Sequence, residues 1–192
     1  MNDVRLDSKE EIHSKIKLEK FDIHQCSPLC FGEILQIERE TFDELDDKDI
    51  LREYSEEMLK KVLQPPHITL GAWYDSVLVG FSVLYYPQTN SENDSEDNLS
   101  TFLNGVDITG LKTANNKRCI VKKDFRGNSL QYELGCRLEI YAQKSDVKLM
   151  CATVSPKNTY SIKNIQRLGY IYNKRLLMYG SERNLYYKFI QS

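Results

Sequence analysis

The segment 118–154 constrains the fold of this chain most, because it places a helical pattern between two short apolar runs. The runs are 118–121 and 148–154, and between them a leucine recurs every fourth residue from Leu130 to Leu138. A helix of this length is a usual connection between two parallel strands, which a tight hairpin cannot join. The sequence therefore predicts a βαβ unit whose crossover is right-handed.

The rest of the chain predicts further helices and strands around this unit. One helix is expected over 28–42, where five side chains recur at helical spacing: Phe31, Ile34, Leu35, Glu38 and Phe42. A second helix is expected over 50–63, and a hairpin of 68–74 and 77–85 turns at Asp75-Ser76. We also expect a short strand over 16–21, a helix over 158–168, and closing strands over 170–174 and 185–190.

Length and composition indicate one soluble globular domain. The chain has 192 residues, of which 41% are hydrophobic and 28% are charged. We expect a mobile tail over 1–15, a single domain over 16–192, and a long surface excursion over 88–116 within it. No apolar run approaches the roughly 20 residues of a membrane-spanning helix, and the charged N-terminus lacks a signal sequence. We therefore expect a cytoplasmic protein with no membrane partner.

Charge and cysteine usage exclude two further classes of function. The net charge of -2 argues against a nucleic-acid partner. Five scattered cysteines, an odd number, favour reduced thiols over a disulfide framework. Cys26 and Cys30 are four residues apart, but the three histidines form no HxxxH or CxxC-type pair, so no metal site is expected.

The turn that opens the predicted crossover helix is basic and contains a glycine. Lys122, Lys123, Arg126 and Gly127 lie between the strand and the helix. The first amides of a helix have no internal partner and carry partial positive charge, so a phosphate or pyrophosphate suits this position. The same pattern is also common in ordinary turns, and it is neither GxxxxGK[ST] nor GxGxxG.

Three blocks of this sequence resemble the GNAT superfamily of acyl-CoA N-acyltransferases. Residues 126–131, Arg-Gly-Asn-Ser-Leu-Gln, look like its pyrophosphate loop, and 153–158 with Leu168-Gly169-Tyr170 resembles its second conserved block. Tyr179-Gly180 followed by Arg183 resembles a bacterial branch. The resemblance spans roughly residues 16–190. It implies an α/β domain with a mixed, mostly antiparallel sheet of six or seven strands, a splayed central parallel pair and about four helices.

The resemblance also implies a set of residues that bind acetyl-CoA. The turn amides would hold the pyrophosphate, the strand before the turn would line the pantetheine arm, and the next helix would contact the same arm. In chain order these residues are Cys119, Ile120, Val121, Arg126, Gly127, Asn128, Ser129, Leu130, Gln131, Asn158, Ser161 and Asn164.

This sequence departs from the family's pattern at three places. Ser129 and Gln131 replace small residues of the loop, which suits amide binding if the dihedral angles of Ser129 stay helical. Ile165 stands where the family often has a tyrosine that protonates the leaving thiolate. The acidic residue often found on the splayed strands is missing. Candidate substitutes for the tyrosine are Tyr160, Tyr170 and Tyr179, each of which also suits the core or the rim of the domain.

The predicted function is transfer of an acetyl group from acetyl-CoA to a primary amine of an unidentified small molecule or peptide. Attack is expected to be direct, in a ternary complex, because Cys119 has no visible His partner to make it a nucleophile. Substrate-binding candidates are Glu38, Tyr179 and Arg183. Glu38 and its acidic neighbours suit a cationic amine or are a solvated helix end, and Arg183 suits an acceptor carboxylate or a surface ion pair.

The main alternative is a CoA-binding or protein-interaction module that keeps the fold with little catalysis. The missing tyrosine and acid favour this alternative, whereas Arg126-Gly127 and Asn158 favour the enzyme. The sequence leaves a monomer and a homodimer equally open.

Overall fold

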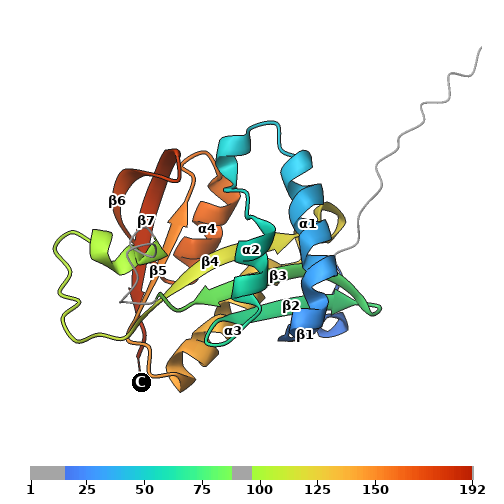
Figure 1. The fold of residues 1–192 in the computed structure, drawn as a ribbon, viewed down its shortest axis with the longest axis horizontal. Helices are drawn as coiled ribbons and strands as arrows, with labels where there is room; N and C mark the ends of the chain where they lie inside the picture. The colour runs from blue at the N-terminus through green and yellow to red at the C-terminus, as the bar shows by residue number, and fades with distance from the viewer. Residues whose placement is uncertain (1–15, 88–96, 192) are drawn as a thin grey trace, which may run out of the picture.

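A computed structural model describes residues 16–87 and 97–191 of the chain. Their centre is a seven-stranded sheet in the order β1-β2-β3-β4-β5-β7-β6 (Figure 1). The tail predicted over 1–15 and part of the predicted excursion, 88–96, lie outside the described residues. Within the described residues, no helix combines the length and apolar character needed to cross a membrane.

The first half of the sheet is an antiparallel meander. β1 (Asp22–Gln25) pairs with β2 (Ile68–Tyr74), which pairs with β3 (Val77–Tyr85). Asp75 and Ser76 both have positive φ, 48° and 65°, which is the backbone of a type I′ turn and confirms the predicted two-residue hairpin. β3 is buried from Leu78 to Tyr85 because helices cover both of its faces.

The predicted parallel pair is β4 (Thr113–Val121) and β5 (Leu149–Val154). The two strands share only three register pairs, the last of which is Asn115 with Cys151. Beyond that point β4 pairs with β3 alone and β5 pairs with β7 alone. The sheet therefore splays open between the C-terminal ends of its two central strands.

Helices lie on both sides of the sheet in Figure 1. α1 (Phe31–Asp43) and α2 (Glu56–Val62) pack in front through Ile34, Ile37 and Leu59. Behind the sheet, α3 (Leu130–Lys144) contributes the predicted leucine stripe to the core, and α4 (Thr159–Arg167) adds Ile165. β6 (Ile171–Met178) and β7 (Ser181–Phe189) complete the sheet as a hairpin.

Several predicted boundaries were wrong. Residues 18–20 form a 3-10 turn instead of part of a strand, and the strand follows at Asp22. α2 begins only at Glu56, because the side chain of Ser55 caps its N-terminus by accepting from the Met58 amide. β4 begins at Thr113, so the predicted excursion ends before residue 116, and the closing strands are longer than predicted.

Candidate functional site

The gap between β4 and β5 opens into two cavities that share part of their lining. The outer cavity has a volume of about 780 Å³ and lies between the turn before α3, the start of α4 and the segment after α1. The inner cavity, of about 100 Å³, lies between the splayed strands and reaches the β6–β7 turn. Shared lining residues are Ile50, Leu51, Cys119, Gln131, Asn158, Ser161 and Asn164.

The structure brings eleven of the twelve predicted acetyl-CoA residues to the wall of the outer cavity. Those that line it are Cys119, Ile120, Val121, Arg126, Gly127, Ser129, Leu130, Gln131, Asn158, Ser161 and Asn164. Asn128 is the exception, since its buried side chain does not line the outer cavity. It accepts a hydrogen bond from the Ile16 amide at 2.8 Å and donates to the Phe125 carbonyl at 3.0 Å. Asn128 therefore fixes the shape of the turn from behind.

The turn before α3 presents unpaired backbone amides to the outer cavity. Gly127 has a φ of 82°, and Ser129 has a φ of 60° and a ψ of 13°. Ser129 is thus left-handed, so the condition that its dihedral angles stay helical is not met. A left-handed residue followed by the right-handed Leu130 turns successive N–H groups toward one side, which forms an anion-binding concavity. No side chain caps α3, so its first-turn amides also keep their hydrogen-bonding capacity.

Side chains of α3 and α4 form a connected polar floor beneath this turn. Asn158 caps α4 by accepting from the Ser161 amide at 3.0 Å. Gln131 donates to the Ser161 hydroxyl at 3.3 Å and accepts from the Asn164 amide group at 2.9 Å. These four predicted residues therefore hold one another in place, which fixes the distance between the starts of the two helices.

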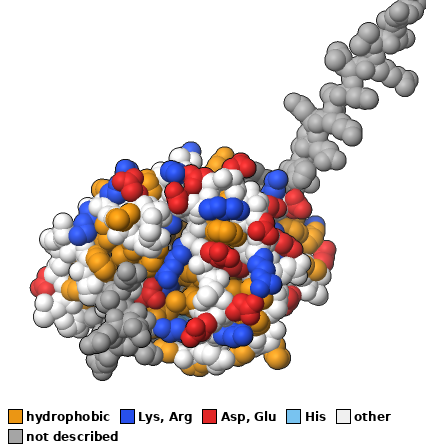
Figure 2. Space-filling model, turned by 45° about the horizontal axis from the view of Figure 1, so that its top comes forward, with side chains coloured by type: hydrophobic (Ala, Val, Ile, Leu, Met, Phe, Trp, Pro, Cys, Tyr) orange, Lys and Arg blue, Asp and Glu red, His pale blue; other side chains and the backbone are white. Residues whose placement is uncertain are grey.

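Two basic side chains of the segment between β4 and α3 face carboxylates of α1 or the residue that follows it. Arg126 lies 3.8 Å from Glu44, and Lys122 lies 3.4 Å from Glu40. Basic and acidic side chains accordingly stand close together on the face shown in Figure 2. The acidic end of α1 therefore faces the chain's own cations. These pairs are partly exposed, so each contributes little to stability.

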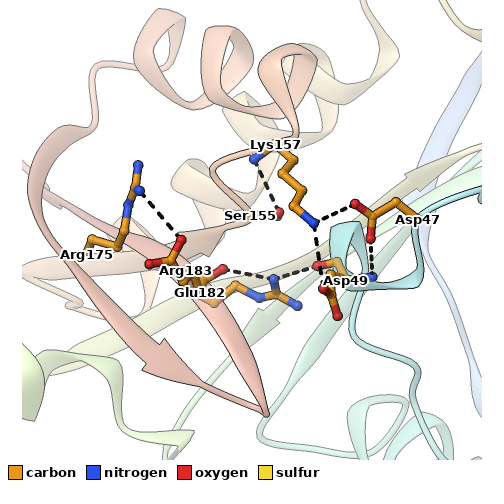
Figure 3. A network of polar contacts seen from close by, with 7 residues as sticks. All are labelled: Asp47, Asp49, Ser155, Lys157, Arg175, Glu182 and Arg183. Atoms are coloured by element: carbon orange, nitrogen blue, oxygen red, sulfur yellow. Dashed lines mark hydrogen bonds and ion pairs between the residues drawn. The ribbon is translucent and has the colours of Figure 1, made fainter.

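A further ion pair lies at one side of the outer cavity. Lys157, just before α4, lies 2.7 Å from Asp47 and 3.7 Å from Asp49 (Figure 3). The hydrogen bond from Lys157 lowers the pKa of Asp47, and the same contact raises the pKa of Lys157. Arg183 reaches the same segment from β7 by donating to the Asp49 carbonyl at 2.6 Å. The segment after α1 is thereby tied to the loop before α4 and to β7.

The lining of the inner cavity is rich in cations. Arg52, Lys117, Arg118 and Arg183 all line it. Arg118 is paired with Glu38 of α1, whose carboxylate accepts from the guanidinium Nε at 3.1 Å and from the Tyr54 amide at 3.2 Å. Glu38 is 1% exposed and lines neither cavity, so the structure gives this predicted substrate residue a buried pairing role.

The candidate tyrosines lie in three different surroundings. Tyr179 lines the inner cavity at the β6–β7 turn and its hydroxyl lies 3.4 Å from Asp97. Tyr160 is 80% exposed at the rim of the outer cavity. Tyr170 is buried, lines neither cavity, and its pKa is raised well above the usual value by burial. Only Tyr160 and Tyr179 therefore reach the cavities.

Cys119 and Ile165 both occupy the wall that the splayed strands share with α4. Burial raises the pKa of the Cys119 thiol to about 12, so the thiol stays protonated at neutral pH. Ile165 is buried and lines the inner cavity with an apolar side chain. Neither residue supplies a proton donor or a nucleophile. Among the described residues, no three His, Cys, Asp or Glu side chains gather as a metal site requires.

Solved acetyltransferases resemble this chain over most of its length. The acetyltransferase of GNAT family from Streptococcus pneumoniae has a TM-score of 0.64 and 16% identity, and the match covers 89% of this chain and 99% of that one. Arabidopsis thaliana NAA60 in complex with acetyl-CoA has a TM-score of 0.65 and 17% identity, covering 90% and 99%. Ribosomal-protein-alanine N-acetyltransferase from Brucella melitensis has a TM-score of 0.65 and 14% identity, covering 88% and 99%. The chain has the GNAT fold.

No protein-family model and no curated protein match this sequence. The likeness is therefore one of fold, and it confirms the predicted fold class. The mixed, mostly antiparallel sheet, the single parallel pair and the four α-helices of the described residues all agree with the GNAT fold.

Sequence reasoning found Tyr179 and Arg183 of the inner cavity but missed three of its other residues. Tyr54, Arg52 and Lys117 were not singled out as site residues. Lys117 is the extra residue of a bulge in β4, where Asn116 and Arg118 face consecutive residues of β3. One signal for a buried ion pair was present, because Glu38 falls on the apolar stripe of its helix and a buried carboxylate needs a cation.

Proposed function

We propose that this protein transfers an acetyl group from acetyl-CoA to a primary amine, by direct attack in a ternary complex. One observation carries the proposal: the β4–β5 pair separates after Asn115, next to an uncapped helix N-terminus, and opens into a cavity of about 780 Å³. The matching fold of acetyltransferases, one of them solved with acetyl-CoA, supports the same function.

The chain's residues fit acetyl-CoA at two places. The unpaired amides from Gly127 to Gln131 suit the pyrophosphate, since they combine hydrogen-bond donors with the positive end of the α3 dipole. The edge of β4 from Cys119 to Val121 has no strand partner on the β5 side, so its backbone groups are available to the pantetheine arm. In chain order, the proposed contacts of acetyl-CoA are the twelve predicted residues, with Asn128 contributing its backbone only.

Acetyl-CoA would supply the acetyl group as an activated thioester. The chain must bring a neutral amine to it, because a primary amine with a pKa of about 10 is mostly protonated at pH 7. We propose that the splayed edge of β4 orients the thioester carbonyl, and that the inner cavity orients the amine. Cys119 stays a neutral thiol, which supports direct transfer without a covalent enzyme intermediate.

Proton transfer is assigned to groups that reach the cavities. We propose Tyr179 in the inner cavity as the proton donor to the leaving thiolate, with Tyr160 at the rim as the second candidate. The leaving thiol has a pKa of roughly 8.5, so its departure needs only modest acid assistance. Tyr170 is not proposed, because its hydroxyl is buried away from both cavities.

A second candidate function rests on Ile165. An apolar side chain at the position where a tyrosine often assists catalysis favours a CoA-binding or protein-interaction module with little turnover. Release of free thiol from acetyl-CoA in the presence of an amine panel separates the two functions. Turnover supports the enzyme, and tight binding without turnover supports the module.

Calorimetric titration of acetyl-CoA tests the proposal directly. We expect micromolar binding by the wild type, at least tenfold weaker binding by Arg126→Glu, and unchanged binding by Arg39→Glu, which alters an exposed arginine of α1 outside both cavities. A folded wild type that does not bind acetyl-CoA would overturn the acetyltransferase and the CoA-binding module, and would leave only a protein-interaction module. The predicted cytoplasmic location, domain boundaries and oligomeric state stay predictions.

A further inference from the structure

The inner cavity carries more positive than negative charge. Its lining contains four cations and, among the residues that the structure describes, no carboxylate. Two carboxylates lie just behind the lining. Glu38 forms an ion pair with Arg118. Asp97 lies 2.6 Å from Lys117 and 3.4 Å from Arg52. Two carboxylates against four cations leave a surplus of positive charge facing the cavity.

Arg183 accounts for much of this surplus. Its guanidinium donates to the main-chain carbonyls of Asp49 at 2.6 Å and Glu182 at 3.1 Å. In the described part of the chain, no carboxylate oxygen lies within ion-pair distance of it, because the Asp49 carboxylate faces Lys157 (Figure 3). Arg183 is 5% exposed, and the hydrogen-bond partners of this buried cation are neutral carbonyls, with the Asp49 carboxylate acting on it only from beyond ion-pair distance. A buried charge without a counter-ion is costly, and a bound anion would relieve that cost.

The cations of the inner cavity also raise one another's energy. Burial lowers the pKa of Arg118 first, and the positive charge of Arg183 lowers it further. Burial likewise lowers the pKa of Arg183, and the nearby Arg52 adds to that effect while Asp49 and Tyr179 oppose it. These side chains are therefore close enough to share one field, which favours an anion between them.

Tyr54 adds an unused hydrogen-bond donor to the same wall. Its side chain is 6% exposed, and the guanidinium of Arg118 stacks on its ring at 4.2 Å. Its hydroxyl is buried and has no hydrogen-bond partner among the described residues. A buried hydroxyl without a partner is unusual in a native protein. Because Tyr54 lines the inner cavity, its hydroxyl is a donor that an anion bound there can use.

We propose that the inner cavity binds a carboxylate of the acceptor, so that the acetylated substrate is an amine that also carries a carboxylate, as an amino acid does. This inference rests on the proposed function for the amine of the acceptor. It rests on Arg183 and Tyr54 for the carboxylate of the acceptor. Arg183 pairs with the carboxylate and the Tyr54 hydroxyl donates to it. The inner cavity therefore replaces the acidic end of α1 as the feature that recognises the acceptor.

The size of the inner cavity agrees with a small carboxylate group. A cavity of about 100 Å³ admits a carboxylate and a few carbon atoms, well below the usual volume of a drug-sized pocket. The shared lining with the outer cavity places the rest of the acceptor toward Cys119 and Asn158. The amine then lies on the side of the splayed edge of β4.

Two probes of nearly equal shape, one negatively charged and one neutral, test the proposal. N-acetyl-L-alanine and N-acetyl-L-alaninamide differ only in a carboxylate and a carboxamide, and their binding to the CoA-loaded protein can be followed by saturation-transfer NMR. We expect the acid to bind at least about tenfold more tightly than the amide. Equal binding, preference for the amide, or no binding of either probe at about 10 mM would overturn the proposal.

Three variants locate the effect. Arg183→Gln should weaken binding of the acid about tenfold and leave that of the amide unchanged. Tyr54→Phe removes only an unpartnered hydroxyl, so the protein should stay folded while the acid binds about threefold less tightly. Arg39→Gln, the matched arginine change outside both cavities, should leave both affinities unchanged. A preference for the acid that survives both cavity variants would contradict the assignment.

Acetyl-CoA titration and thiol release separate this inference from the proposed function. Selective binding of the acid without acetyl-CoA binding would keep the carboxylate site and overturn the acetyltransferase. Acetyl transfer to amino acid amides in preference to the acids would keep the enzyme and overturn the carboxylate site. A free amino acid and a peptide amide that begins with Asp distinguish the two sources of the carboxylate, since only the second presents it on a side chain.

Discussion

The buried pair of Glu38 and Arg118 joins α1 to the splayed half of β4, and its loss should be costly. The two side chains are 2% and 4% exposed. Glu38→Gln removes the negative charge and turns an amide N–H₂ toward a guanidinium that can only donate. The change leaves the volume of the side chain nearly unaltered, so packing contributes little to the effect.

The expected loss follows from the charge that is left behind. Breaking a buried ion pair by removing one partner costs about 3–5 kcal/mol, because the remaining ion is neither solvated nor paired. For a chain of this length each kcal/mol lowers the melting temperature by about 2–4 °C, so the variant should melt about 6–20 °C below the wild type. Glu38 also accepts from the Tyr54 amide, which a glutamine oxygen can still do.

Urea unfolding followed by the fluorescence of the single tryptophan, Trp73 of β2, measures this loss. Glu40→Gln is the matched control, because Glu40 is an exposed residue of the same helix with a comparable ion pair to Lys122 at 3.4 Å. The control should lose less than about 1 kcal/mol.

A second variant tests the reason for the loss. Glu38→Gln/Arg118→Met removes both charges, so it should regain at least half of the stability that the single variant loses. The reasoning is refuted if Glu38→Gln costs no more than Glu40→Gln. It is equally refuted if the double variant is as unstable as the sum of its two single variants.

Three further predictions concern pH, the turn and the buried thiol. Burial, opposed by Asp97, lowers the pKa of Lys117 to about 8 from 10.5, so the native state binds fewer protons than the unfolded state between these values. Stability relative to Lys117→Met should therefore rise by up to about 3 kcal/mol from pH 8 to pH 10.5 in urea titrations, and a flat difference would contradict this sign. Gly127→Ala and Gly105→Ala both place an alanine at positive φ in open space, so each should lower the free energy of unfolding by about 1 kcal/mol. Only Gly127→Ala should weaken acetyl-CoA binding in calorimetry. Burial raises the pKa of Cys119 to about 12, so its thiol should react with maleimide at pH 8 at least about 100-fold more slowly than a free cysteine. Mass spectrometry measures this rate. Labelling at the rate of a free cysteine would exclude the neutral thiol.

Local patterns in the sequence were sufficient for several elements of the fold. The leucine stripe of α3, the Asp75-Ser76 turn and the apolar run of β5 were all predicted, because periodicity and turn chemistry depend on neighbours along the chain. The start of β4 was not predicted, because its first residues, 113–117, are mostly polar. Asn115 is buried there because its side chain donates to the Asp97 carbonyl, a partner 18 residues away.

The sequence by itself determined the parallel unit and the hairpin, since each follows from spacing within a short segment. The residues around the outer cavity came from the resemblance to the GNAT superfamily. Only the tertiary structure decided the partners of the charged groups. Glu38 and Arg118 are 80 residues apart, and Arg183 and Asp49 are 134 apart. Whether a charge lies in water, beside an opposite charge or beside a cavity depends on which segments pack together. The energy of a charge depends so strongly on those surroundings that Arg183, which the sequence left open between an acceptor carboxylate and a surface ion pair, could be assigned to the inner cavity only from the folded chain.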